Sequence, residues 1–346
     1  MKSKRMLVAC VIVFVLTAAR CKAQSCRTRD IPFNIFSHDQ NAELSLSPSD
    51  LDASAGRQRL TIAAVMPRAE SHKIVLLSDV SGSMLEPDGA GSNPGSWYFQ
   101  WELAADFISA VPGEHEVGLA VFAGRMRPLL WPTRDRADLM DQIQSLELHR
   151  TEFLAQKDLG RETALWDAIR EAVVMFGPFN PGDAVYVISD ADDNASKAPA
   201  ELVKETLLNA GIRLFTFRFI DPGSGLAFSK APAGLSGLVE SRYTLAELLR
   251  DLAGDTGGWV TSAHRPRGGF GLQSQLPTHF EGPPELRRTL DFLYWLMEGF
   301  YTVRVAFPAP RLRSAPLTLS LRTANRARQR ELTITYPRAL MPCTGK

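Results

Sequence analysis

Short apolar runs, each bounded by polar residues, recur through the middle of the chain and predict buried strands. The first run is Ile74-Val75-Leu76-Leu77, which ends at Ser78-Asp79. Comparable runs lie at residues 116–122, 127–131, 184–188, 212–220 and 259–262. Strands that are apolar on both faces are typical of a parallel sheet covered by helices on each side.

Segments with helical spacing separate these strands. Leu103, Phe107 and Val111 recur every four residues, which predicts a helix over residues 99–111 that ends at Pro112-Gly113. The same spacing predicts helices at 134–147, after Thr163, at 198–209 and before Gly257. Strands that alternate with helices of this length predict an α/β fold with a doubly wound, mostly parallel sheet.

The two ends of the chain show a different period. Apolar and polar residues alternate at 32–36 and 59–65, with Ser-, Asp- and Gly-rich turns between, and again at 301–305, 317–321 and 332–336. Alternation with period two buries one face of a strand and exposes the other. The N- and C-terminal segments are therefore expected to form one smaller antiparallel β module. A helix at 285–298, apolar on both sides, is expected to be sandwiched between the α/β unit and another part of the protein.

The first residues have the pattern of a secretory signal peptide. The basic segment Lys2-Ser3-Lys4-Arg5 precedes an apolar stretch at residues 6–19, and cleavage is expected near Ala23. This stretch is shorter than the roughly 20 residues that span a bilayer. The mature chain is expected to have no membrane span and to be secreted, periplasmic or at the cell surface. A retained N-terminal anchor is the alternative.

Composition limits the classes of partner. The chain has 346 residues, 45% of them hydrophobic and 22% charged, as in ordinary globular proteins. Removal of residues 1–23 leaves 34 basic and 38 acidic side chains, a net charge of −4. This charge offers no basic field for nucleic acid. The expected division is a signal peptide at 1–23, an N-terminal β segment at 24–71, the α/β domain at 72–263, a linker at 264–284, and a helix with the C-terminal β segment at 285–346.

Two cysteines, Cys26 and Cys343, remain in the mature chain, one near each end. In an oxidising compartment they could form a disulfide that holds the two ends of the β module together. Two free thiols are the alternative. No Cys-x-x-Cys spacing or cluster of cysteine and histidine indicates a zinc site.

Five oxygen-bearing side chains follow predicted strands or begin a predicted helix. They are Asp79, Ser81, Ser83, Thr163 and Asp190. Taken singly, the first three fit an ordinary turn and Thr163 fits a helix N-cap. Taken together, they meet at the edge of the sheet where the parallel strands end, which is where open α/β sheets place ligands. Carboxylate and hydroxyl oxygens suit Mg²⁺, or alternatively Mn²⁺ or Ca²⁺.

These residues stand in the order found in the von Willebrand factor type A family, which the chain resembles over about residues 72–263. Asp79, Ser81 and Ser83 match its Asp-x-Ser-x-Ser motif, Thr163 matches the Thr of Gly-Gly-Thr-Ala-Leu-Tyr-Asp-Ala, and Asp190 matches the Asp of Thr-Asp-Gly. The resemblance implies a Rossmann-like fold and a metal-ion-dependent adhesion site formed by these five residues. It also implies, from the flanking β segments, a secreted bacterial type of protein.

Two positions depart from the family pattern. Glu162 stands where the family has the second glycine, and Ala191 stands where it has the glycine after the Asp. The first change is expected to place an additional carboxylate near the rim of the site. The second is expected to restrict the loop, and neither change removes a ligand.

The resemblance and the charge of the site together predict a binding function. Neutral hydroxyls and two carboxylates would leave a bound cation able to accept an Asp or Glu from a protein partner. The expected function is metal-dependent protein binding or adhesion, without catalysis. One alternative is a structural envelope scaffold that the metal only stabilises. Another is Mg²⁺-dependent phosphoryl transfer, against which the chain has no second Asp two residues after Asp79, no Gly-rich phosphate loop and no recognisable Ser/His/Asp set.

Overall fold

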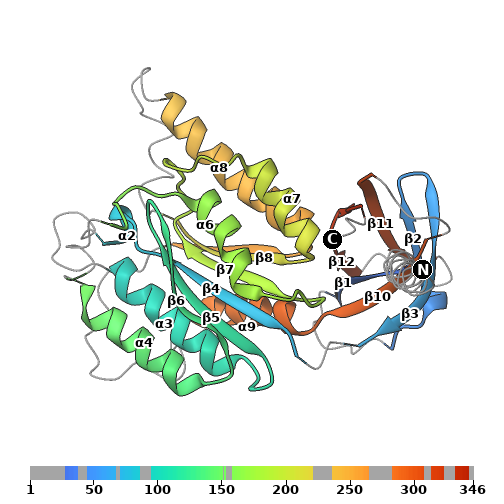
Figure 1. Ribbon diagram of the computed structural model, residues 1–346, viewed down its shortest axis with the longest axis horizontal. Helices are drawn as coiled ribbons and strands as arrows, with labels where there is room; N and C mark the ends of the chain where they lie inside the picture. The colour runs from blue at the N-terminus through green and yellow to red at the C-terminus, as the bar shows by residue number, and fades with distance from the viewer. Residues whose placement is uncertain are drawn as a thin grey trace, which may run out of the picture.

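The computed structural model describes residues 28–37, 45–67, 71–85, 95–150, 152, 158–220, 236–264, 283–307, 313–322 and 332–342. They form an α/β lobe and an all-β lobe that lie next to each other (Figure 1). The predicted signal peptide, Cys26, Cys343 and nearly all of the predicted linker lie outside the described residues. Within the described part of the chain, no helix has both the length and the apolar character needed to cross a bilayer.

The α/β lobe is built on a six-stranded sheet with the order β6-β5-β4-β7-β8-β9. The strands are β4 (Lys73–Asp79), β5 (Glu116–Phe122), β6 (Met126–Thr133), β7 (Ala184–Ser189), β8 (Arg213–Ile220) and β9 (Trp259–His264). Neighbouring strands are parallel except the edge pair β5 and β6, which is antiparallel. Residues 74–79 of β4 are all buried, as the apolar run predicted.

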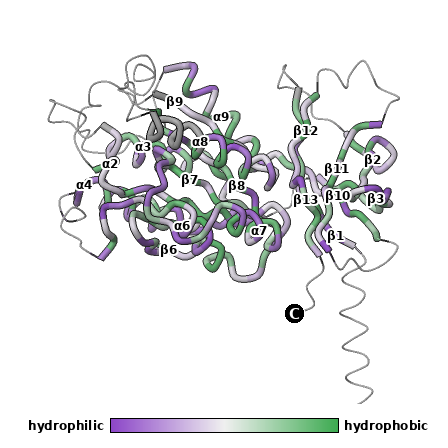
Figure 2. Tube along the Cα trace, turned by 90° about the horizontal axis from the view of Figure 1, so that it is seen from above, coloured by the Kyte–Doolittle hydropathy of each residue, from purple (hydrophilic) through white to green (hydrophobic). Residues whose placement is uncertain are grey.

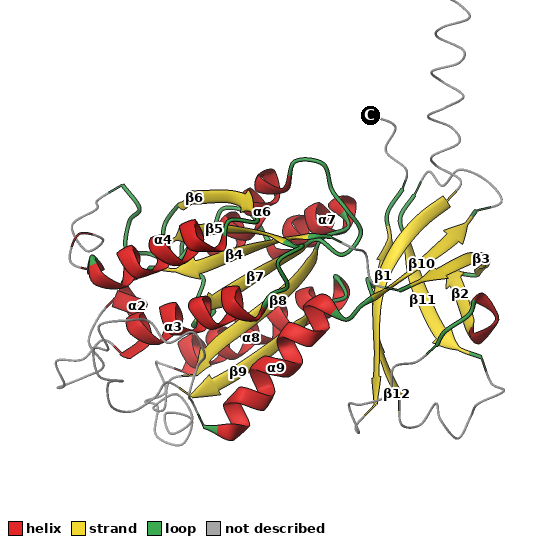
Figure 3. Cartoon of the chain, turned by 90° about the horizontal axis from the view of Figure 1, so that it is seen from below, coloured by secondary structure: helices red, strands yellow, loops and turns green. Residues whose placement is uncertain are grey.

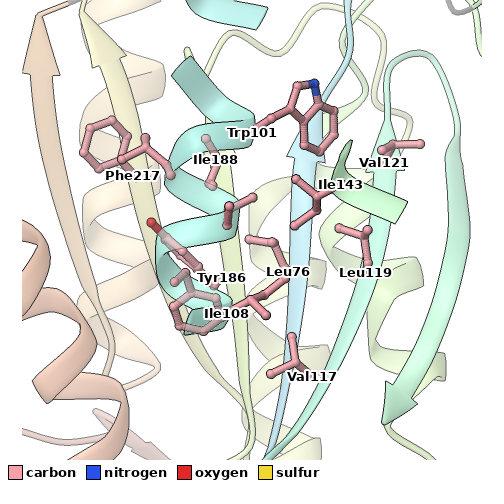
Figure 4. Packing of buried hydrophobic residues seen from close by; sticks show 14 of the residues in the cluster. Leu76, Trp101, Ile108, Val117, Leu119, Val121, Ile143, Tyr186, Ile188 and Phe217 are labelled. Atoms are coloured by element: carbon pink, nitrogen blue, oxygen red, sulfur yellow. The ribbon is translucent and has the colours of Figure 1, made fainter. Parts of the chain in front are cut away.

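Helices cover both faces of this sheet (Figure 3). One face packs against α3 (Gly95–Ala110), α4 (Arg136–Leu148) and α9 (Pro284–Glu298), and the other against α6 (Leu165–Ala172), the short helix η2 (Val173–Phe176), α7 (Ala200–Ala210) and α8 (Ser236–Asp255). Figure 4 shows the first core, where Trp101 and Ile108 of α3 approach Leu76 and Tyr186 of the sheet. Successive residues of β4 point to opposite faces, so Val75 lies in the second core.

The all-β lobe is a seven-stranded antiparallel sheet with the order β12-β1-β10-β3-β2-β11-β13. Its strands are β1 (Thr28–Ser37), β2 (Leu51–Ala55), β3 (Gln58–Met66), β10 (Tyr301–Ala306), β11 (Ala315–Leu321), β12 (Leu332–Thr335) and β13 (Ala339–Leu340). Strands from the two ends of the chain interleave, because β10 pairs with both β1 and β3. The predicted fold class, a doubly wound α/β sheet with a smaller antiparallel module from the two ends, is confirmed.

One strand of this lobe was predicted incorrectly as part of a turn region. Residues 51–55 form β2, which pairs with β11 on one side and β3 on the other. Its buried residues are Leu51, Ala53 and Ala55, so its alternation is regular although its side chains are small. The view from above again separates the two lobes, each with its own hydrophobic segments (Figure 2).

Arg213, the first residue of β8, connects the two lobes. Its buried guanidinium donates hydrogen bonds to the carbonyl oxygens of Leu296, Met297 and Gly182 and to Oδ1 of Asn34 on β1, at 2.7–3.2 Å. Asn34 in turn donates from Nδ2 to the carbonyl oxygen of Leu296 at 2.9 Å. Helix α9 therefore contacts the all-β lobe at its end while its buried residues lie in the first α/β core, which agrees with the predicted sandwich.

Glu102 on α3, which feels the charge of Glu147 on α4, predicts a pH dependence of stability. Burial, and then the charge of Glu147, raise the pKa of Glu102 to about 7. A folded-state pKa above the unfolded value adds stability that is complete below the unfolded pKa and is lost as pH rises through the folded pKa. Since Glu102 is only half-buried, we expect a loss of about 1 kcal/mol between pH 4.5 and 8.

The variant Glu102→Gln tests this dependence. The fall in unfolding free energy between pH 4.5 and 8, measured by urea denaturation, should be smaller in Glu102→Gln than in the unchanged protein. The control is Glu205→Gln, which removes an exposed carboxylate from α7. An equal pH slope in all three proteins would contradict the assignment.

Candidate metal centre

Asp79 ends the central strand β4 and is fully buried. Its Oδ1 accepts a hydrogen bond from the backbone N–H of Ser81 at 2.8 Å, and its Oδ2 accepts one from the hydroxyl of Ser189 at 2.5 Å. Ser189 ends β7, the strand next to β4. The carboxylate is thus held in a defined orientation by groups from two neighbouring strand ends.

The two serines of the motif lie on the turn that follows β4. The short helix α2 (Gly82–Leu85) begins there, and the hydroxyl oxygens of Ser81 and Ser83 are 3.2 Å apart. The backbone N–H of Gly82 donates to the carbonyl oxygen of Arg161 at 2.8 Å. This bond ties the serine turn to the loop that carries Thr163.

Asp190 follows β7 directly and supplies a second carboxylate close to the first. Burial, and then the charge of Asp190, raise the pKa of Asp79 to about 7, against the lowering effect of the hydrogen bonds from Ser189 and Ser81. Such a shift indicates that the two carboxylates repel each other in a poorly solvated place. A divalent cation would remove this repulsion.

Thr163 is held at the same edge by its backbone. Its N–H donates to Oδ1 of Asn194 at 2.8 Å, and its carbonyl oxygen accepts from the N–H groups of Asn194 and Ala195. Thr163 is not the N-cap of the following helix, because α6 begins at Leu165 and the adjoining residue is Ala164. The alternative prediction, that Thr163 is the N-cap of this helix, is therefore wrong.

The N-terminus of α6 is capped by the loop after β7 instead. Oδ1 of Asp193 accepts from the N–H of Leu165, and the hydroxyl oxygen of Ser196 accepts from the N–H groups of Trp166 and Asp167, at 2.9–3.2 Å. This arrangement satisfies the free N–H groups of the helix without the Thr163 hydroxyl. The sequence analysis did not identify Asp193 or Ser196 as capping residues, because they are about 30 residues away along the chain.

The additional carboxylate of Glu162 turns back toward its own loop. Its Oε2 accepts a hydrogen bond from the N–H of Arg161 at 3.2 Å. Bonds from the N–H groups of Glu162 and Arg161 lower the pKa of this exposed side chain. The same oxygen lies close to Gly124 and Gly160. Glu162 thus shapes the rim of the site through its contacts with the backbone.

Ala191 has a left-handed backbone conformation, with φ of 63°, and is the one non-glycine residue with positive φ in the described part of the chain. The left-handed region costs an L-residue with a side chain roughly 1–2 kcal/mol. The predicted restriction of this loop thus has a physical basis. The N–H of Ala191 donates to the hydroxyl of Ser189 at 2.9 Å, which helps to hold the conformation.

We expect Ala191→Val to destabilise the protein by about 2–3 kcal/mol, because a β-branched side chain is poorly compatible with positive φ and the position is buried. Ala191→Gly removes the left-handed penalty at the cost of one buried methyl group, so it should stay within about 1 kcal/mol of the unchanged protein. Urea denaturation measures both. Equal losses in the two variants would show that backbone conformation is not the cause.

The donor set fits a hard divalent cation. The oxygens offered are the carboxylates of Asp79 and Asp190 and the hydroxyls of Ser81, Ser83 and Thr163, and hard cations prefer oxygen ligands. Among the described residues, no group of three or more His, Cys, Asp or Glu side chains could hold a metal. A cation at this edge would therefore depend on the neutral hydroxyls. The five residues remain predicted ligands.

Ser189 is a residue that the sequence analysis did not assign. A recurring signal was present, because Ser78-Asp79 and Ser189-Asp190 both stand at the end of a buried apolar run, but nothing in the sequence distinguished the roles of the two serines. In the structure, the Ser189 hydroxyl donates to Asp79 and accepts from Ala191. It orients one predicted ligand and the loop that carries another.

The variant Ser189→Ala should weaken Mg²⁺ binding by about tenfold or more, since groups that orient metal ligands typically contribute this much to affinity. It should also lower the unfolding free energy by about 1–2 kcal/mol, because a buried hydrogen bond is lost. Titration calorimetry and urea denaturation measure the two effects. The control Ser109→Ala removes a hydroxyl that bonds only within α3. Unchanged Mg²⁺ affinity in Ser189→Ala would contradict the positioning role.

Comparison with known proteins adds a set of distant structural neighbours. No protein-family model and no curated protein matches the chain. Solved structures do match. This chain is similar to two von Willebrand factor type A structures among them.

Three of the similar structures show how low the similarity is in sequence and in fold. The protein BatB from Bacteroides thetaiotaomicron is 20% identical, with 56% of this chain and 91% of that chain covered and a TM-score of 0.41. A von Willebrand factor type A protein from Catenulispora acidiphila is 10% identical, with 91% and 73% covered and a TM-score of 0.40. An aerotolerance-related membrane protein from Bacteroides fragilis is 22% identical, with 42% and 67% covered and a TM-score of 0.35.

Proposed function

We propose that this protein is a non-enzymatic binding module that captures a protein partner through a divalent cation, Mg²⁺ or alternatively Mn²⁺ or Ca²⁺. The observation that carries the proposal is the pair of carboxylates, Asp79 and Asp190, at neighbouring strand ends, where burial and then the charge of Asp190 raise the pKa of Asp79. Together with the hydroxyls of Ser81 and Ser83, which lie 3.2 Å apart, they would form a partly neutral, oxygen-rich site. The order of the five residues in the sequence supports the same proposal.

Each residue has a separate role in this proposal. Asp79 and Asp190 supply the negative charge, and Ser81, Ser83 and Thr163 supply neutral oxygens. The bound cation would provide an electrophilic position for one external carboxylate. Because three of the five donors carry no charge, an acidic side chain of a partner compensates the remaining positive charge at a lower cost than if it were buried unpaired.

The protein is proposed to act outside the cytoplasm, since the basic and apolar pattern of residues 1–23 predicts export. Its two lobes are connected through Arg213, Asn34 and the end of α9. The all-β lobe would then serve as a base that carries the binding lobe.

Partner capture tests the proposal. The mature chain is immobilised and exposed to detergent-solubilised native membranes and to culture medium, with Mg²⁺ or with chelator, and bound proteins are crosslinked and counted by mass spectrometry. We expect a specific set of proteins that is lost with chelator and lost in Ser83→Ala. Ser145→Ala, which removes an exposed hydroxyl from α4, is the matched control.

Two other outcomes would contradict the proposal, and each would indicate a different function. If Mg²⁺ raises the melting temperature but no protein depends on it for capture, the cation stabilises a scaffold. If the protein hydrolyses a generic phosphoester such as p-nitrophenyl phosphate, and Asp79→Asn abolishes this turnover, the site is catalytic.

A further inference from the structure

A groove beside the candidate metal centre has no role in the proposed function so far. It has a volume of about 490 Å³ and is lined by the loop before β6, by α6 and by the segment before α7. The loop before β6 and the segment before α7 both form hydrogen bonds with residues 163–164, which directly precede α6. The N–H of Ala164 bonds to the carbonyl oxygen of Ala123, and the N–H of Ala195 bonds to that of Thr163. The groove and the candidate metal centre are therefore built from adjoining parts of the same loops.

Three cationic side chains line this groove, namely Arg125, Arg170 and Lys197. All three are exposed, and no described residue forms an ion pair with any of them. Three cations held on one surface without acidic partners repel each other and attract an anion.

Two acidic residues also line the groove. One of them, Asp167, is engaged by the backbone, since its two carboxylate oxygens accept from the N–H groups of Lys197 and Ala198 at 2.9–3.0 Å. Glu171 is exposed and remains the one acidic side chain of the lining without such bonds. These hydrogen bonds leave the charge of Asp167 in place, so the lining carries three positive and two negative side chains, a net charge of +1.

The start of α7 adds positive potential to the same groove. Pro199, which lines it, is the N-cap of this 11-residue helix, and no side chain caps the N-terminus. Free N–H groups and the helix dipole favour an anion at such a place. This feature supports the three cations and does not by itself define a site.

We propose that the groove of Arg125, Arg170 and Lys197 binds a second acidic residue of the partner segment whose first carboxylate is captured at the candidate metal centre. The inference rests on the proposed function, and it specifies the partner as an acidic, extended protein segment. Thr163 and Arg170 are seven residues apart along a mostly helical stretch, or roughly 10 Å. An extended peptide covers about 3.3 Å per residue, so the two acidic residues would be about three positions apart.

Binding of fluorescein-labelled decaglutamate, followed by anisotropy at low salt, tests the groove. The groove variant is Arg125→Gln/Arg170→Gln/Lys197→Gln. The matched control, Arg59→Gln/Arg134→Gln/Arg288→Gln, removes three exposed arginines from β3, from the end of β6 and from α9. We expect the groove variant to bind at least about tenfold more weakly than the control, with Mg²⁺ and also with chelator. Labelled decaglutamine should not bind.

Measurements with Asp79→Asn and with chelator distinguish this inference from the proposed function. Asp79→Asn and chelator should each weaken decaglutamate binding while leaving the difference between the groove variant and its control in place. If neither has any effect but the groove variant binds weakly, the groove inference stands and the metal-dependent function is wrong. If the groove variant binds as tightly as its control, the groove inference is overturned.

Discussion

Asp79→Asn is expected to abolish Mg²⁺ binding and at the same time to stabilise the metal-free protein at pH 8. Burial and the charge of Asp190 raise the pKa of Asp79 to about 7, so at pH 8 the folded state carries an ionised carboxylate that the fold disfavours. An asparagine keeps a similar shape and removes this charge. We expect a gain of about 1 kcal/mol in unfolding free energy without metal, the usual scale for relieving one such repulsion.

The pH dependence of this stability gain follows from the raised pKa of Asp79. A carboxyl whose folded pKa is raised favours folding when it is protonated, and this contribution is lost as pH rises through the folded pKa. The gain from Asp79→Asn should therefore be largest at pH 8, shrink as the pH falls below about 7, and disappear only below the unfolded pKa of Asp, about 4. In the unchanged protein, Mg²⁺ should add stability that the variant lacks.

Thermal unfolding with Mg²⁺ and with chelator, together with titration calorimetry, measures both effects. The control Asp141→Asn removes an exposed carboxylate from α4. If Asp79→Asn binds Mg²⁺ with unchanged affinity, the candidate metal centre is wrong. If it destabilises the metal-free protein, Asp79 has a structural role that outweighs its repulsion from Asp190.

Arg213→Ala is expected to cause the largest loss of stability of any substitution considered, about 3–5 kcal/mol. The guanidinium is fully buried, and burial lowers its pKa to about 9, so it is still charged at neutral pH. Its removal takes one donor from each of four buried acceptors, on Asn34, Gly182, Leu296 and Met297, although Leu296 keeps the bond from Asn34 Nδ2. Each unsatisfied buried acceptor costs about 1–3 kcal/mol.

Urea denaturation measures this loss, and hydrogen exchange at the end of α9 and in β1 locates it. Arg213→Lys keeps the charge but cannot donate to four acceptors in the plane of a guanidinium, so we expect an intermediate loss. A small loss in Arg213→Ala, below about 1 kcal/mol, would show that the two lobes are held together by other contacts.

The fold followed closely from the sequence where the hydrophobic pattern was strong. The strands at 73–79, 116–122 and 184–189 are fully or almost fully buried, and burial on both faces produces an unambiguous apolar run. The strand at 51–55 was missed because its inward residues are mainly alanine, which carries little pattern. The antiparallel direction of β6 was also not predicted, although the three residues between β5 and β6 are too few for a parallel crossover.

Part of the candidate site was predictable from the same strand pattern. Asp79, Ser81 and Ser83 are close in sequence, and Asp190 follows a buried strand, so the topology of a parallel sheet brings them to one edge. Ser189, Asp193 and Ser196 were not assigned, because each acts on a residue that is between 28 and 110 positions away. The cations of the groove come from three separate segments and have no common motif.

The sequence by itself determined the α/β architecture, the β module built from both ends of the chain, and the order of the five predicted ligands. These properties are local or periodic, so the sequence records them directly. Only the tertiary structure decided which oxygen orients Asp79, what caps α6, where Glu162 turns, and how Arg213 joins the lobes. These properties depend on distances between residues far apart in the chain, and they arise only when burial brings polar groups together and requires each of them to find a partner.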